Sequence, residues 1–546
     1  MKNLSVISIL TAVSAALIFT GCIKETLPTS VATTEQVAAS PSALQASVRG
    51  IPSQMATGYL TGSNYAFDMG YPGLMLIWDH ATGEIVDTGN TGYDWYSYWS
   101  QPIASMGELY VTTSIPWRTV YILIKAANDV IGAINPEEAT EDQLISLGQA
   151  YAFRAQFYLN AARMYEYKAP TDPKVEAFYK PEGDIEGLTV PIVTEKTTQE
   201  QARNNPRATV EEIYEQIFGD LDAAEQYLAN TKSVSDVFPS LAVVYGIKAR
   251  AYLERGSAGV DGAFASAAEY ARKAIDTFGG SPLTQSQWED PINGFNNASA
   301  NSNSWMWYLH YDSEYIGNLV TFVAHMAPEE TWTSYGWSVG RGINKSLYDK
   351  IPDTDFRKHS WIDPNTTDYY AYKTNRDVFG KTKTLKPYAN LKFRPAQGNC
   401  DTYKVGGASE VPLMRVEEMM LIEAEGLAMS GKLSEGISAL EKFIQTRNPE
   451  YTCSVANTYA FQQEVYLQKR IELWGEGLIY FDAKRLQAGM RNGYLGTNVQ
   501  EGYRFTVSGV APIWNFVIPR IEINANPALD GLNNPDPTNA IAEWKE

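Results

Sequence analysis

The chain has 546 residues and carries 63 acidic side chains against 44 basic ones, a formal net charge of −19. This acidity disfavours nucleic acids and anionic lipid surfaces as partners. The cysteines, Cys22, Cys400 and Cys453, are too few for a disulfide framework and lack zinc-ligand spacing. Whether Cys400 and Cys453 pair is left open. The length exceeds that of one hydrophobic core, so we expect two or three packed units.

The N-terminus has the pattern of an export signal. Lys2 precedes an apolar run at residues 6–19, which ends in Thr20-Gly21-Cys22. The run is shorter than the roughly 20 apolar residues that a membrane-spanning helix needs, so residues 1–21 are predicted to be a signal peptide. Thr-Gly-Cys resembles the bacterial lipobox, although Phe19 replaces the usual Leu, and this implies that Cys22 is acylated. The alternative is an ordinary signal peptide in which Cys22 has no role.

A Ser-, Thr- and Ala-rich stretch follows, and residues 22–48 are predicted to be the acylated Cys and a flexible tether, with a helix beginning near Ser40. Apolar residues and alanines then recur at helical spacing. Pro116 is expected in the first turn of the first long helix, and Asn135-Pro136 ends it. Within an N-terminal region at 49–280, the predicted helices cover residues 117–134, 141–166, 208–229, 239–255 and 261–278.

Residues 281–411 change character. They are rich in Gly, Asn, Pro, Trp and Tyr, which predicts an irregular insert with short strands such as 305–311. Trp305 and Trp307 alternate within that strand and are expected in the core. A C-terminal region at 412–546 resumes the helical pattern, with helices predicted at 412–430, 433–447 and 460–488.

Small residues recur where paired helices would meet. Ala424, Ala428 and Gly436 fall at positions that resemble a tetratricopeptide repeat, although Gly436 stands where Ala is usual. Residues 249–275 give a second match with a longer turn. A generic helical bundle would also show small residues, but the two matches together favour a mainly α fold of tetratricopeptide-like helix pairs.

Ordered motifs run along nearly the whole mature chain. They are Trp117, Tyr121 and Ala127-Asn128, AFRAQFYLNAARMYE with GLTVPIV at 187–193, RATVEEIYEQIFGDLDAAEQYL at 207–228, Asp355-Phe356-Arg357, the Arg415–Glu425 helix, RIELWGEGLIYFDAKRL at 470–486, and VIPRIEINANPAL at 517–529. In this order they resemble the SusD/RagB family of nutrient-binding outer-membrane lipoproteins. Departures at Glu417, Gln468 and Ile479 indicate a divergent member. The resemblance implies a SusD-like fold and, as partner, a SusC-like TonB-dependent transporter.

No motif of catalysis or of cofactor binding is present. His80, His310, His325 and His359 lack metal or triad spacing, and neither a nucleophile elbow nor a phosphate-binding loop occurs. Asp353, Asp355, Asp363 and Asp368 lack the ordered spacing of a calcium loop. The signature charges, which include Arg415, Glu472, Glu476, Asp482 and Arg485, are expected to pair between helices and support the fold. We therefore expect no enzyme, no metal and no cofactor.

Aromatic residues mark the candidate binding site. Residues 93–99 hold five aromatics in seven positions, in a Gly- and Asn-rich context. Aromatic faces stack on the C–H faces of sugars, and Asp or Asn side chains meet the hydroxyls. The resemblance implies a glycan site built from this N-terminal loop and the insert. We predict Trp95, Trp99, Tyr315, Trp332 and Trp337 as stacking platforms, with Asn90 and Asp94 as polar contacts; for each, burial in the core or contact with the transporter is the alternative.

These observations together predict a lipoprotein of the outer membrane that faces the cell exterior. It would capture an oligosaccharide or a polysaccharide fragment and deliver it to the SusC-like transporter. The alternatives are a peptide-binding protein of the same family, a structural subunit of the transporter, and a glycan hydrolase that uses paired carboxylates.

Overall fold

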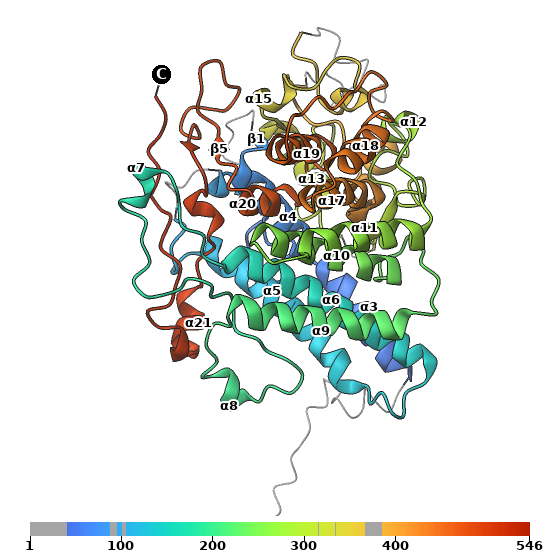
Figure 1. The fold of residues 1–546 in the computed structure, drawn as a ribbon, viewed down its shortest axis with the longest axis vertical. Helices are drawn as coiled ribbons and strands as arrows, with labels where there is room; N and C mark the ends of the chain where they lie inside the picture. Colours follow the sequence, from blue (N-terminus) through green and yellow to red (C-terminus); the bar gives the residue numbers. More distant parts are fainter. Residues whose placement is uncertain are drawn as a thin grey trace, which may run out of the picture.

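The computed structural model describes residues 41–87, 95–100, 105–314, 316–333, 335–365 and 385–545, and the predicted signal peptide and Cys22 lie outside them. The described chain is mostly helical, with three short two-stranded antiparallel sheets (Figure 1). The mainly α fold predicted from the sequence is confirmed. No helix in the described ranges is long and apolar enough to cross a membrane.

The long helices pack in the order in which they follow along the chain. Helix α5 packs on α6, α6 on α9, α9 on α10, and α10 on α11, which in turn contacts α17. In Figure 1, α6, α9 and α10 run side by side and α17, α18 and α19 lie above α11. The long helices are α3 (Pro41–Met55), α4 (Gly70–Thr82), α5 (Val111–Ala133), α6 (Glu141–Tyr165), α9 (Val210–Leu228), α10 (Leu241–Ser257), α11 (Ala263–Phe278), α17 (Val416–Met429), α18 (Leu433–Ile444) and α19 (Thr458–Glu472).

Small residues let these helices approach closely, as the repeat pattern predicts. A Cβ added to Gly436 on α18 would lie 2.7 Å from the carbonyl oxygen of Ala424 on α17. One added to Gly426 would lie 2.6 Å from the carbonyl oxygen of Phe264 on α11. Both contacts are with backbone, which cannot move aside as a flexible side chain can. Glycine is therefore the residue that these two helix contacts require.

Three predicted helix boundaries are wrong. Helix α5 begins at Val111, so Pro116 lies in its second turn, where it has no N–H to donate to the helix. Residues Glu410–Arg415 form strand β4 rather than the start of a helix; Pro412 fits the end or edge of a strand better than a helix interior. The long helix predicted at 460–488 is two helices, α19 and α20 (Ile479–Arg485). Gly475 and Gly477, with φ of 79° and 70°, interrupt it.

Helix α4 was not predicted, and every one of its residues is buried. A helix that is covered on all sides has no polar face, so its sequence lacks the amphipathic period by which surface helices are recognised. Trp78 of α4 packs on Phe481 of α20 at a centroid distance of 4.9 Å. The N-terminal and C-terminal helical regions thus share one hydrophobic core.

The insert is irregular, as expected, and short sheets tie it to the rest of the chain. Strand β1 (Ile85–Asp87) pairs with β3 (Arg341–Ile343), and β2 (Trp305–His310) pairs with β4 (Glu410–Arg415), while β5 (Met490–Arg491) pairs with β6 (Thr506–Val507). Trp305 and Trp307 are buried in the core, as predicted. The short helices are α7 (Pro173–Glu176), α8 (Gln199–Ala202), α12 (Gln285–Trp288), α13 (Phe322–Met326), α14 (Tyr335–Val339), α15 (Lys345–Tyr348), α16 (Tyr403–Gly406) and α21 (Arg520–Ala525).

Candidate ligand-binding surface

The two aromatic segments predicted from the sequence are brought together by a short sheet. Strand β1 ends at Asp87, which pairs with Arg341, and only Gly340 separates Arg341 from the end of helix α14. Through this pairing, the end of β1 therefore lies close to the helix that carries Trp337. The loop returns as a 3₁₀ helix, η1 (Trp95–Trp99), which packs on α4.

The geometry of η1 decides which of its rings face solvent. A 3₁₀ helix has three residues per turn, so side chains at i and i+3 lie on the same side. Tyr96 and Trp99 share the inner side and are fully buried, while Trp95 and Tyr98 are only partly buried. The rings of Trp99 and Phe67 pack edge to face at 5.1 Å.

Trp99 was predicted as a stacking platform, and at 0% exposure it offers no face to a ligand in this structure. Trp95 has the better position, because it lies on the outer side of the same turn.

Tyr65 is a candidate residue that the sequence did not single out. Its side chain is 40% exposed, and its ring meets Trp95 edge to face at 6.3 Å. On its other side Tyr65 stacks on Phe67 at 5.1 Å. The buried carboxylate of Asp68 organises the loop before it by accepting hydrogen bonds from Thr61 and Ser63. A lone tyrosine in a polar loop carries no periodic signal, so only the structure shows that it extends the aromatic surface.

The insert contributes Trp332 and Trp337, which differ in exposure. Trp337, on α14, is 36% exposed. Trp332 is partly buried against α16; a Cβ added to Gly406 would lie 2.8 Å from its ring. Trp332 therefore presents only part of its ring. The other predicted contacts, Tyr315, Asn90 and Asp94, lie outside the described residues.

Buried rings connect the two segments beneath this surface. Tyr96 of η1 meets His325 of α13 edge to face at 5.2 Å, and His325 stacks on Tyr335 of α14 at 4.6 Å. Burial, reinforced by the positive charge of Arg341, lowers the pKa of His325 well below its usual value. His325 is therefore neutral at neutral pH. Trp95 and Trp337 each lie within two residues of this buried row.

We call the side chains of Tyr65, Trp95, Tyr98, Trp332 and Trp337 the aromatic surface. Each of these five side chains is partly or largely exposed. Cavities of about 320 Å³ each lie elsewhere, one lined by Tyr348 and Trp361 among others and one by Tyr451 and Cys453 among others. Partly exposed rings outside a cavity fit a ligand that is laid along them, such as an extended chain molecule, better than a small molecule that must be enclosed.

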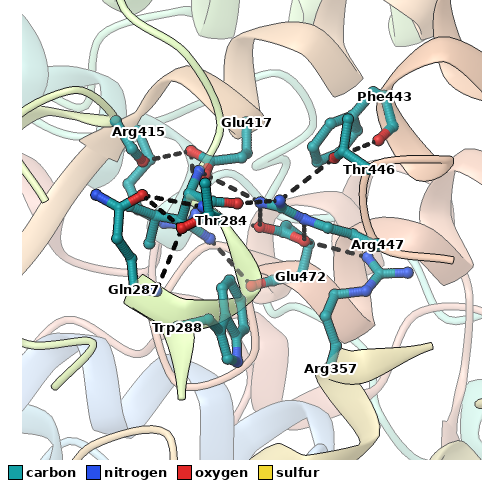
Figure 2. A network of polar contacts seen from close by, with 12 residues as sticks. Thr284, Gln287, Trp288, Arg357, Arg415, Glu417, Phe443, Thr446, Arg447 and Glu472 are labelled. Atoms are coloured by element: carbon teal, nitrogen blue, oxygen red, sulfur yellow. Dashed lines mark hydrogen bonds and ion pairs between the residues drawn. The ribbon is translucent and has the colours of Figure 1, made fainter. Parts of the chain in front are cut away.

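The family-signature charges form ion pairs that support the fold, and Arg415 and Glu472 are fully buried. Glu472 lies within 3.1 Å of Arg357, Arg415 and Arg447, which come from the insert, from β4 and from the end of α18 (Figure 2). Burial alone would raise the pKa of Glu472, but the three guanidinium groups outweigh it and hold that pKa well below its usual value. The pair Glu472 and Glu476, a candidate for glycosidase chemistry, is thus explained by ion pairing.

The aspartates considered for calcium are also engaged elsewhere. Asp355 accepts hydrogen bonds from Arg357, and Asp353 pairs with Lys358 at 2.6 Å. Among the residues that the structure describes, no group of three or more His, Cys, Asp or Glu could hold a metal ion. Asp368 lies outside them. Cys400 and Cys453 are both buried and are not joined in a disulfide.

Comparison with known proteins shows that the fold is SusD-like. Residues 81–253 match the SusD-like family model described as starch-binding associating with outer membrane. A SusD-like carbohydrate binding protein from Bacteroides vulgatus ATCC 8482 is 21% identical, with a TM-score of 0.66, and the match covers 89% of this chain and 96% of that one. A putative sugar binding protein from the same organism is also 21% identical, with a TM-score of 0.64 over 89% of this chain and 97% of its own.

A SusD superfamily protein from Bacteroides thetaiotaomicron VPI-5482 is 19% identical and has a TM-score of 0.63, and the match covers 90% of this chain and 99% of that one. None of the curated proteins matches the chain. The SusD-like fold expected from the ordered motifs is confirmed. The SusD-like family model matches residues 81–253 of the chain.

Proposed function

Because the chain is SusD-like in fold and in family model, we propose that it is a surface lipoprotein that captures oligosaccharides or polysaccharide fragments and delivers them to a SusC-like TonB-dependent transporter. In this proposal Cys22 carries the lipid that holds the protein on the outer membrane, with the folded body facing the cell exterior. The aromatic surface is the glycan-binding site.

The observation that carries the proposal is the convergence of aromatic rings from distant parts of the chain. Tyr65 and Trp95 come from the N-terminal region and Trp337 from the insert, and all three keep part of their ring in solvent. Large apolar rings are normally drawn into the core. Partly exposed rings suit a ligand that stacks on them, and the C–H faces of sugars do so.

Binding without turnover suits this surface. Its described aromatic side chains supply no pair of carboxylates, and the signature carboxylate of Glu472 is held by arginines in the core. A few stacking contacts of about 1 kcal/mol each give modest affinity. Modest affinity is what a delivery protein requires, because the transporter must be able to take the ligand from it.

The first test is a glycan panel and a peptide pool presented to purified protein in which Cys22 has been removed. We expect oligosaccharides to bind and peptides not to. Trp337→Ala should weaken glycan binding about fivefold, because one aromatic contact of about 1 kcal/mol is lost. The matched control is Tyr459→Ala, which removes a 70% exposed aromatic ring on α19, away from the aromatic surface.

Unchanged glycan affinity in Trp337→Ala would remove the aromatic surface from the proposal. Binding of peptides alone would favour peptide uptake, and turnover of a bound glycan would overturn the assignment as a binding protein. Delivery is tested separately, by purifying the lipidated protein from outer membranes. Copurification of a large barrel protein is expected, and its absence would contradict the partner.

A further inference from the structure

We infer that Arg341 is the positioning residue of the aromatic surface: its buried guanidinium holds the segment of Trp95 and the segment of Trp337 in a fixed relation, and ligand affinity depends on that relation. The inference rests on the proposed function for its affinity readout, but its structural readout does not.

Arg341 contacts the insert side of the surface through backbone carbonyls. Its side chain is 0% exposed, and Nη1 donates to the carbonyl oxygens of His325 at 2.5 Å and of Tyr335 at 3.3 Å. Tyr335 is the first residue of α14 and lies two positions before Trp337. One guanidinium therefore joins helix α13 to helix α14.

The same guanidinium contacts the N-terminal side of the surface through a ring. Its Cζ lies 5.3 Å from the centroid of Tyr96, within the range of a cation–π contact. Tyr96 is held between His80, on which it stacks at 5.3 Å, and His325, which it meets edge to face. Because Tyr96 follows Trp95 directly in η1, the position of Tyr96 fixes that of Trp95.

Among the residues that the structure describes, the N-terminal region supplies the carboxylate that faces Arg341. Its Nε lies 3.5 Å from Oδ1 of Asp87 and 3.4 Å from Nε2 of His80. Nδ1 of His80 lies 2.8 Å from the carbonyl oxygen of Leu76, and its Nε2 also lies 3.4 Å from Oδ1 of Asp87. Burial would raise the pKa of Asp87, but Arg341 and His80 outweigh it and lower that pKa. The ion pair thus spans the β1–β3 sheet.

The two segments depend on such contacts because neither is stable by itself. Both η1 and α14 are five residues long. Isolated helices shorter than about 12 residues are marginal in water, so tertiary contacts must set their positions. Arg341 is in contact with Tyr96 in one and with Tyr335 in the other. Loss of the guanidinium should therefore free both segments while the long helices α9, α10 and α11 stay packed.

The test compares Arg341→Met, Arg341→Lys and the double variant Arg341→Met with Asp87→Asn. The double variant leaves no unpaired charge in the core and so protects the experiment against simple misfolding. Amide hydrogen exchange of residues 97–100 and 335–339 reports the two segments without any ligand, and titration with a glycan that the wild type binds reports affinity. We expect exchange in both segments to rise about tenfold or more in the double variant, with α9–α11 unchanged.

Affinity should fall about tenfold in the same variant, and Arg341→Lys should recover part of it because an ammonium keeps the charge beside Asp87 and Tyr96. The matched control is Arg207→Met. Arg207 is also buried, at 4% exposure, and donates to the carbonyls of Tyr165, Leu188 and Thr189, away from the aromatic surface. Its loss should lower stability and leave exchange in both segments and affinity unchanged.

Unchanged exchange in the two segments overturns the inference, and so does faster exchange with unchanged affinity. If the wild type binds no glycan, the proposed function fails by itself, and exchange alone decides whether Arg341 holds the segments together.

Discussion

Trp95 and Trp99 are the same residue type four positions apart, yet Trp95 is partly exposed and Trp99 is buried in the core. Their sequence contexts do not separate them, because both lie in one run of aromatics. The difference comes from the 3₁₀ turn, which places positions 96 and 99 together on the inner side. At the residue scale, the type of side chain indicates what a position could bind, and the local backbone decides whether a ligand can reach it.

The burial of Trp99 leads to a prediction about stability. Trp99→Ala should lower the free energy of unfolding by about 3–5 kcal/mol, because the ring leaves a cavity beside Phe67 and Tyr96. Trp337→Ala removes a partly exposed ring and should cost under about 1 kcal/mol. Thermal or denaturant unfolding of the two variants measures the difference. Equal costs would contradict the assignment of Trp99 to the core and of Trp337 to the surface.

At the scale of elements, glycines, which have no side chain, decide how closely two helices can pack. Gly436 departs from the usual repeat pattern, and the structure explains the departure: α17 and α18 are so close that even the Cβ of alanine would overlap backbone. By contrast, Gly219 on α9 is not in a close helix contact, because nothing lies within 4 Å of a Cβ added there. Two glycines in helices thus have different roles that composition alone does not distinguish.

These two glycines give a matched pair of substitutions. Gly436→Ala should destabilise the protein by about 1–3 kcal/mol, because overpacking forces the helices apart. Gly219→Ala should stabilise it by about 0.5–1 kcal/mol, because alanine loses less backbone entropy in a helix. Denaturant unfolding of both variants, with the slope against denaturant unchanged, measures the signs. Effects of the same sign would show that helix approach does not control the contact between α17 and α18.

At the scale of the whole molecule, buried ion pairs join regions that are far apart in sequence. Arg357 of the insert, Arg415 of β4 and Arg447 beyond α18 meet on Glu472 of α19 (Figure 2). A second group joins Glu425 of α17 to Lys469 and Arg485. Removing a single partner from such a group leaves a buried charge unpaired, so the insert and the C-terminal helices are held in one arrangement.

These carboxylates make the fold sensitive to acid. Burial would raise the pKa of Glu425, but Arg485 and Lys469 outweigh it and lower the pKa to about 2. The unfolded value is higher, about 4.5, so the unfolded state binds the proton first as pH falls. The stabilisation by Glu425 is therefore present above about pH 4.5 and is lost as the pH falls towards about 2.

We expect the free energy of unfolding to decrease over this pH range in the wild type. In Glu425→Gln the decrease should be smaller, because one titrating group is gone, while stability at neutral pH is lower. Denaturant unfolding at several pH values measures both effects. An identical pH dependence in the two proteins would contradict the role of Glu425.

Prediction from the sequence succeeded where the signal is periodic or ordered. The spacing of apolar residues located the long helices α6, α9, α10 and α11 to within a few residues, because a helix that buries one face repeats its pattern. It missed α4, which is buried on all sides, and the break at Gly475 and Gly477, where long-range contacts interrupt a helical pattern. The candidate site was predicted only as a set of aromatic residues.

What the sequence by itself determined is the mainly α fold, the order of its helices and the two aromatic segments, because periodicity and composition are local properties. What only the tertiary structure decided is which rings remain open, that Tyr65 joins them, and that Arg341 lies between Tyr96 and Tyr335. These depend on the pairing of β1 with β3, whose strands lie more than 250 residues apart in the chain. Contacts at such separation leave no local pattern, so they become visible only once the chain has folded.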